Sequence, residues 1–250
     1  MIHPGIQGGP RGAALALVRK ELYSYSISPF FYGITVFFLL FVSIWLFYVQ
    51  RFFALNTASL RPFFAAFPVG FVLVIPAITM KGWAEERKLG SIELLLTMPF
   101  SEWDLVLGKF IASLTMLALI IGLTIPVPLS LLPLGDFDPG TILGEYAGAL
   151  LLGASATSLG LLLSCVSRSQ AGAFLGSAVV LLMMMFINQI TLTLNLPPLI
   201  TEGINFFSLS FHFETFSKGI IDTRDVAFFV LTTVLFLFLN TRVLIFRKWR

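Results

Sequence analysis

Charged residues and cysteine are both scarce in this chain of 250 residues, and each scarcity excludes a class of protein. Charged side chains make up 12% of the sequence and hydrophobic residues 57%. That charged share is about half of the share in an ordinary soluble domain, so a soluble globular fold is excluded. The one cysteine, Cys165, excludes an intramolecular disulfide and a metal site built from several cysteines. The sequence therefore predicts an integral membrane protein.

Further absences narrow the function. The chain has no Gly-x-x-x-x-Gly-Lys-Ser/Thr loop, so it does not bind ATP by that device. Its aromatic residues lie within apolar runs and not between basic residues, which excludes nucleic acid as a partner. The first five apolar runs have no ionisable residue near their centres, which argues against proton coupling. A sodium site built from backbone carbonyls stays open.

Six apolar runs are long enough to cross a bilayer as helices, since about 20 residues span the hydrocarbon. The predicted spans are residues 30–49, 62–80, 110–132, 141–166, 171–192 and 226–246. Before them, residues 11–26 place Leu15, Val18, Leu22 and Tyr25 on one side of a helix, which predicts an amphipathic segment lying on the membrane surface. The fold class is therefore an all-α membrane protein with a single transmembrane domain.

Two long connections separate the spans. Residues 83–109 concentrate charge and are predicted to stand in water. Residues 193–225 alternate aromatic with charged side chains, which predicts short amphipathic helices at the outer interface. All but four of the 16 Lys and Arg residues fall on the side of residues 83–109 and of both termini; the four are Arg51, Arg61, Lys218 and Arg224. The positive-inside rule therefore predicts that both termini are cytoplasmic.

The segment 83–109 contains two predicted helix starts. Ser91 can cap a short helix that has Glu93 in its first turn and ends before Pro99. Ser101 can cap the next helix, with Asp104 at the third helical position as an approximate capping box. Both patterns predict ordered structure between the second and third spans.

The first of these helices carries an apolar face of Ile92, Leu95 and Leu96 between charged residues. A small apolar knob held between two spans suits docking into a partner's cleft. The alternative is a solvated loop whose leucines lie on the membrane surface.

A membrane protease is one alternative function. Gly153-Ala154-Ser155-Ala156 is loosely similar to the serine motif of rhomboid proteases, with His212 as the base. However, Ala156 stands where that motif has glycine, and His212 falls in the outer connection, away from Ser155. A nucleophile and its base must come within hydrogen-bond reach. No catalytic residue, metal ligand or cofactor site is therefore predicted on this chain.

Four motifs occur in the order found in one transporter family, and together they cover most of the chain. They are Glu85-Glu86-Arg87-x-x-Gly90-Ser91-Ile92-Glu93-x-Leu95-x-x-x-Pro99; Asp104-x-x-x-Gly108-Lys109; Leu159-Gly160-Leu161 with Ser164, Arg168 and Gln170; and His212-Phe213-x-x-Phe216-x-x-Gly219-x-x-Asp222-x-Arg224-Asp225. With these motifs the chain resembles the membrane subunit of an ABC type-2 transporter. It is most similar to the branch that includes the gliding-motility-associated permease and the permease of nitrous-oxide-reductase maturation.

The resemblance implies a permease subunit in the plasma (inner) membrane of a prokaryote, with a cytoplasmic coupling helix between spans 2 and 3. The implied ATPase-coupling residues are Glu85, Glu86, Arg87, Gly90, Ser91, Ile92, Glu93, Leu95 and Leu96. The implied partners are a separate ATPase subunit that holds ATP and Mg²⁺, a second permease subunit that is identical or different, membrane lipid, and an extracytoplasmic protein.

Two alternatives stay open. The chain could transmit ATPase-driven motion to an outer partner without moving a solute, or it could be a six-span carrier or channel that works without ATP. Neither the substrate nor the direction of transport is predicted, because a shared fold does not fix the function.

Overall fold

The computed structural model describes residues 10–54, 59–90, 101–194 and 197–248, and all regular structure in these ranges is helical. Six helical segments are long and apolar enough to cross a membrane, so the prediction of an all-α membrane protein with six spans is confirmed. The main helices are α1 (Pro10–Ile27), α2 (Pro29–Ile44), α3 (Arg61–Phe64), α4 (Ala66–Lys88), α6 (Glu102–Gly122), α7 (Pro126–Leu131), α8 (Pro139–Val166), α9 (Gln170–Leu194), α10 (Pro198–Phe206), α11 (Leu209–Ser217) and α12 (Thr223–Lys248). Short helical turns complete them: η1 (Trp45–Val49), η2 (Phe52–Ala54) and η3 (Leu132–Leu134).

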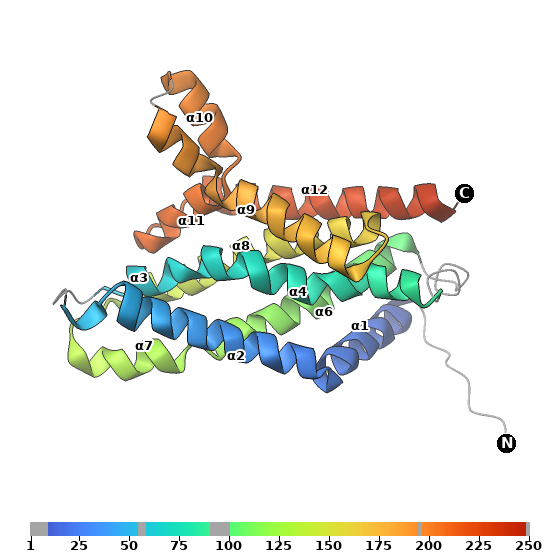
Figure 1. Cartoon of the computed structure of the whole chain (residues 1–250), viewed down its shortest axis with the longest axis horizontal. Coiled ribbons are helices and arrows are strands. Elements are labelled where there is room, and N and C mark those ends of the chain that lie inside the picture. The colour runs from blue at the N-terminus through green and yellow to red at the C-terminus, as the bar shows by residue number, and fades with distance from the viewer. Residues whose placement is uncertain (1–9, 55–58, 91–100, 195–196, 249–250) are drawn as a thin grey trace.

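The long helices form an elongated bundle with α4 at its centre (Figure 1). α4 packs against α8, α9 and α2, while α12 packs on α8 and α1 lies along α6. Burial agrees with the central position of α4. In the most apolar 18-residue stretch of the span that contains α4, 78% of the residues are buried, against 28% in the span that contains α2. α4 therefore belongs to the most buried of the six spans.

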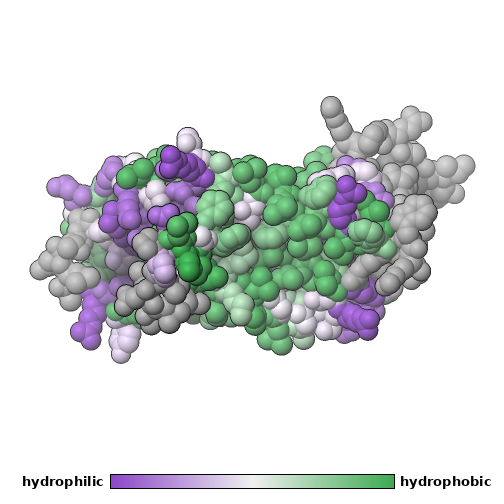
Figure 2. All heavy atoms as spheres, turned by 90° about the horizontal axis from the view of Figure 1, so that it is seen from above, coloured by the Kyte–Doolittle hydropathy of each residue, from purple (hydrophilic) through white to green (hydrophobic). Residues whose placement is uncertain are grey.

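The bundle has two ends that differ in their elements. One end, here called the α1 end, holds α1 and the C-terminal ends of α4, α8 and α12 (Figure 1). The other, called the α11 end, holds α7, α11 and the N-terminal ends of α4, α8 and α12, and α10 projects from it (Figure 1). Figure 2 shows an apolar band between hydrophilic ends, as expected for a protein whose middle lies in lipid.

Aromatic packing holds the middle of the bundle together. Phe38 of α2 and Phe67 and Phe71 of α4 are fully buried, and the rings of Phe38 and Phe67 meet edge to face at 5.4 Å between centroids. Glycines on α8 allow close approach of its neighbours: a Cβ on Gly148 would lie 2.7 Å from the ring of Phe216 on α11. Small residues at such positions let helices pack closely in a membrane.

The predicted segment 11–26 lies within α1, but its buried face differs from the predicted one. Leu15 is 72% exposed, whereas Leu17 is buried against Gly108 of α6; Val18 and Leu22 are half-buried and Tyr25 is buried. The reason is that α1 rests on α6 along one side, so the stripe facing the bundle is shifted from Leu15 to Leu17.

Two helices extend beyond the spans predicted for them. The helix predicted as residues 62–80 continues as α4 to Lys88, because the charged residues that follow Met80 are good helix formers. The predicted span 110–132 lies within one apolar segment, Glu102–Leu134, whose helix begins earlier than predicted. The helix is interrupted near the far end of this segment, since α6 ends at Gly122 and α7 begins at Pro126, where proline suits the first turn of a helix.

Candidate functional site

The candidate site lies at the α1 end, where α4 ends and α6 begins. α4 ends at Lys88, and Gly90 then adopts a left-handed φ of +69°, a conformation that glycine adopts without steric cost. At the start of α6 the predicted capping box is confirmed: Ser101 Oγ accepts the Asp104 N–H at 3.1 Å, and Asp104 Oδ2 accepts the Ser101 N–H at 3.3 Å. The two helix ends flanking residues 91–100 are therefore fixed by local structure.

A buried ion cluster joins α1, α4 and α6 close to these two helix ends. Lys109 of α6 donates to Glu21 of α1 at 2.9 Å and to Glu86 of α4 at 2.8 Å. The Lys109 side chain is 2% exposed, and its ammonium lies 5.0 Å from the ring centroid of Trp83. Lys20 lies 3.6 Å from Glu86 and is 60% exposed. Because a buried charge must be compensated where it lies, this cluster fixes α1, α4 and α6 relative to one another.

The prediction that the whole segment 83–109 stands in water is therefore wrong for its two ends. Trp83 and Ala84 are fully buried, and Glu86 and Lys109 are buried in the ion cluster. The reason is that α1 covers this part of α4 and α6 and contributes the carboxylate of Glu21. The sequence analysis missed Glu21; its position on the same helical side as Val18, Leu22 and Tyr25 was the signal that could have found it.

Arg87 joins the same end of α4 to α8. Its guanidinium donates to the carbonyls of Cys165 and Ser167, which lie at the C-terminal end of α8, where a cation complements the helix dipole. Nearby, Ser164 Oγ accepts the backbone N–H groups of Trp83 at 3.2 Å and of Ala84 at 3.3 Å. A displacement of the end of α4 would therefore be passed directly to α8.

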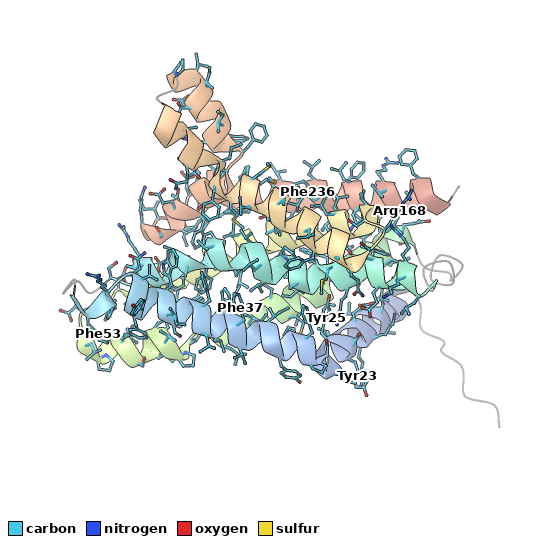
Figure 3. The ribbon with its side chains drawn as sticks, in the orientation of Figure 1. Tyr23, Tyr25, Phe37, Phe53, Arg168 and Phe236 are labelled. Atoms are coloured by element: carbon cyan, nitrogen blue, oxygen red, sulfur yellow. The ribbon has the colours of Figure 1, made fainter. Side chains whose placement is uncertain are left out.

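Tyr25 of α1 packs against α4, on the side of α4 where Glu85 lies. The Tyr25 hydroxyl donates to the Ile78 carbonyl at 3.0 Å and lies 3.2 Å from Ser113 Oγ. Burial raises the pKa of Tyr25 above its usual value, so the phenol stays neutral and can keep donating this hydrogen bond. In Figure 3 Tyr25 points into the bundle, while Tyr23 points away from it. Tyr25 therefore anchors α1 to α4.

Of the predicted coupling residues, the structure describes Glu85, Glu86, Arg87 and Gly90, and it brings the first three together at the end of α4. The others, Ser91, Ile92, Glu93, Leu95 and Leu96, lie outside the described residues. Their role in coupling stays a prediction.

The α11 end has polar groups of its own. His212 of α11 lies 2.6 Å, Nδ1 to Oδ1, from Asp225 of α12, stacks on Phe228 at 3.8 Å between centroids, and is buried. Asp138 caps α8; the Thr141 hydroxyl and then the backbone N–H groups of Gly140 and Thr141 donate to it and lower its pKa. The sequence analysis had placed His212 in the outer connection and had missed its bond to Asp225.

Glu145 of α8 also lies at the α11 end and is fully buried. Neither of its carboxyl oxygens has a hydrogen-bond partner in the described part of the chain. It lines a cavity of about 300 Å³ together with Arg61, whose Nε donates to the Ser217 carbonyl at 2.8 Å. Arg61 and Glu145 therefore share one polar cavity without forming an ion pair.

The arrangement does not assemble a catalytic or metal centre from described residues. Ser155 donates to the Leu152 carbonyl at 2.8 Å within α8, and His212 is bonded to Asp225. No group of three or more His, Cys, Asp or Glu side chains among the described residues could hold a metal ion.

Comparison with known proteins identifies the family. The sequence model of a family described as ABC-2 family transporter protein matches residues 15–247, which include all six apolar spans and the charged end of α4. A search of curated proteins finds no match. Because the match covers nearly the whole chain, the chain belongs to the ABC-2 transporter family and is a multi-pass membrane permease subunit of an ABC transporter.

Proposed function

We propose that the chain couples ATP hydrolysis on a separate ATPase subunit to movement of its spans, and that the ATPase contacts the α1 end at residues 85–96. Membership of the ABC-2 permease family implies association with an ABC ATPase subunit. In this proposal the partner holds ATP and Mg²⁺, a second permease subunit completes the transmembrane unit, and the plasma (inner) membrane of a prokaryote holds the assembly with the α1 end in the cytoplasm.

The ion cluster at Lys109 is the observation that supports this proposal most directly. It ties α1, α4 and α6 together on one side of residues 91–100, and Arg87 ties α4 to α8. A push on a segment held between α4 and α6 would therefore move four helices together and would not bend one loop. Such a rigid unit is what an ATPase needs in order to change the exposure of a path between spans.

Substitutions within residues 91–100 test this proposal. In this proposal Ile92, Leu95 and Leu96 form the apolar surface that enters a cleft on the ATPase. Replacing Ile92 and Leu95 with Asp should abolish co-purification of the ATPase subunit with the tagged chain, or leave ATP hydrolysis that no longer depends on the permease. Both are measured on complexes purified from the native membrane.

A matched control is Leu134→Asp, which puts the same charge on an exposed leucine at the α11 end. This variant should keep the ATPase and its coupled hydrolysis. If the Ile92 and Leu95 variant also keeps both, the ATPase does not dock at this segment and the proposal fails.

The position of α10 favours a second function, which is transmission of motion to an outer protein. This helix extends away from the bundle at the α11 end (Figure 1) and exposes Leu199, Ile200, Phe206 and the adjoining Phe207. Exposed apolar side chains on a projecting helix suit a protein partner. Motion generated by the ATPase would then pass to an outer protein, as in the gliding-motility branch that the sequence resembles.

Export and mechanical transmission can be separated by removing the proposed contact between α10 and the outer partner. Replacing Leu199 and Phe207 with Ser should release the outer partner and leave coupled ATP hydrolysis intact if motion is transmitted. If these substitutions release no protein from the purified complex, the mechanical function loses its support.

A further inference from the structure

A polar cavity of about 220 Å³ lies between α1 and the last turns of α4, close to the ion cluster. Three lysines and three glutamates line it: Lys20, Lys81, Lys109, Glu21, Glu85 and Glu86. Four of these six pair among themselves, since Lys109 and Lys20 both lie within 4 Å of Glu21 and Glu86. The other two, Lys81 and Glu85, take no part in these pairs.

Neither Lys81 nor Glu85 has an ion-pair partner among the described residues. The only hydrogen bond that the Lys81 side chain makes to a described residue goes to Ser28 Oγ at 3.0 Å, and its ammonium lies 5.4 Å from the ring centroid of Phe30. The two side chains are four residues apart on α4, or about 6 Å along its axis. Lysine four residues before glutamate is the less favourable order for a helical ion pair, which fits their separation. One cation and one anion therefore stand side by side in a partly buried cavity.

A small apolar cleft of about 10 Å³ adjoins this cavity. It is lined by Phe30, Phe31 and Ile34 of α2 and by Ala77 and Ile78 of α4. The cleft and the cavity share three lining residues, which are Tyr25, Ser28 and Lys81. Ser28 directly precedes the first span, so the shared residues lie where the polar end of the bundle meets its apolar band. A ligand that contacts both places a charged group in the cavity and an apolar group against the cleft.

We propose that this site binds a phospholipid with an ethanolamine headgroup. Lys81 and Ser28 hold the phosphate, Glu85 accepts hydrogen bonds from the primary ammonium, and the first part of an acyl chain lies against the cleft between α2 and α4. The headgroup supplies one anion and one cation, which matches the two unpaired side chains. Phosphatidylglycerol offers no cation to Glu85, and the quaternary ammonium of phosphatidylcholine has no N–H to donate.

The test uses the purified chain in detergent without an ATPase, so its result does not depend on the proposed coupling. Dioleoyl phosphatidylethanolamine, phosphatidylcholine and phosphatidylglycerol are titrated separately, and bound lipid is counted by native mass spectrometry. Wild type should bind the ethanolamine lipid roughly tenfold or more tightly than the other two. Equal affinity for the three lipids would overturn the proposal.

Two variants separate the two halves of the headgroup. Lys81→Met should weaken binding of all three lipids, while Glu85→Gln should remove only the preference for ethanolamine. Lys88→Met is the matched control, because Lys88 is exposed on the same helix outside the cavity. A Glu85→Gln protein that keeps the preference would contradict the assignment. Lys81→Arg should restore binding, and a thermal unfolding curve for each variant shows that it is folded.

Soluble phosphoethanolamine distinguishes a lipid site from a site for the free headgroup. It has the same charges but no acyl chain, so it should bind much more weakly than the lipid. Equal binding of the two would contradict the role of the cleft between α2 and α4.

Discussion

The two ends of the bundle bury charge in different ways. At the α1 end Lys109 is buried against two carboxylates, and the three side chains come from three helices. At the α11 end Glu145 is equally buried, but its carboxyl oxygens have no hydrogen-bond partner among the described residues. A buried charge with partners fixes the helices that supply them, whereas a buried carboxyl without partners costs free energy and fixes nothing.

This difference matches the roles proposed for the two ends. The α1 end must move as one body if it receives force from an ATPase, and the ion cluster and Arg87 make it one body. The α11 end instead has a polar cavity beside Glu145 and the projecting helix α10. We therefore expect substitutions at the α1 end to cost more stability than equivalent substitutions at the α11 end.

The largest effect is expected for Lys109→Met. It leaves Glu21 and Glu86 facing each other with only the exposed Lys20 near them, which should lower the free energy of unfolding by about 3–5 kcal/mol. Thermal unfolding of the purified protein, followed by tryptophan fluorescence, measures this change. Lys20→Met is the control, since Lys20 is 60% exposed and its pair should contribute no more than about 1 kcal/mol. Similar losses for the two variants would show that burial of Lys109 is unimportant.

The triple variant Glu21→Gln, Glu86→Gln and Lys109→Met sharpens this prediction. It removes all three charges together, so most of the stability lost in Lys109→Met should return. If the triple variant is no more stable than the single one, the loss comes from packing around Lys109 and not from the uncompensated carboxylates.

A smaller loss is expected for His212→Ala at the α11 end. This change removes the bond from α11 to Asp225 of α12 and the ring stacked on Phe228. The free energy of unfolding should fall by about 1.5–3 kcal/mol. Glu214→Gln, in the exposed pair with Lys218 on the same helix, should leave it nearly unchanged. A loss of unfolding free energy as large as that of Lys109→Met would contradict the expectation that substitutions at the α1 end cost more stability than those at the α11 end.

The smallest effect is expected for Glu145→Gln. The change keeps the shape of the side chain and breaks no hydrogen bond within the described structure, so stability should stay the same or rise. The same thermal unfolding assay measures it. A clear loss would mean that the Glu145 carboxylate is compensated after all and that the two ends bury charge alike.

Features that depend on residues close together in the sequence could be predicted from the sequence alone. Apolar runs predicted the six spans, and the spacing of Ser101 and Asp104 predicted the capping box at the start of α6. Periodicity also placed Tyr25 on the side of α1 that faces the bundle, but it misplaced Leu15, because which stripe of α1 is buried depends on how that helix rests on α6.

Features made by distant residues could not be predicted in this way. Glu21 and Lys109 are 88 residues apart in the chain, and Glu86 reaches the same ammonium from a third helix. The concentration of charge in residues 83–109 assigned Glu86 and Lys109 to water, because sequence alone does not show which distant charges meet. Only the packing of α1 over α4 and α6 shows that they compensate one another in the interior.

The sidedness of the two ends tests most directly whether the α1 end receives an ATPase. Lys88→Cys and Asp136→Cys place exposed thiols at the α1 and α11 ends, and the buried Cys165 of the parent protein serves as the blank. With a membrane-impermeant maleimide on intact spheroplasts, we expect labelling at position 136 and none at position 88 until the cells are lysed. Labelling at position 88 in intact spheroplasts would place the α1 end outside, away from ATP, and would contradict the proposed coupling.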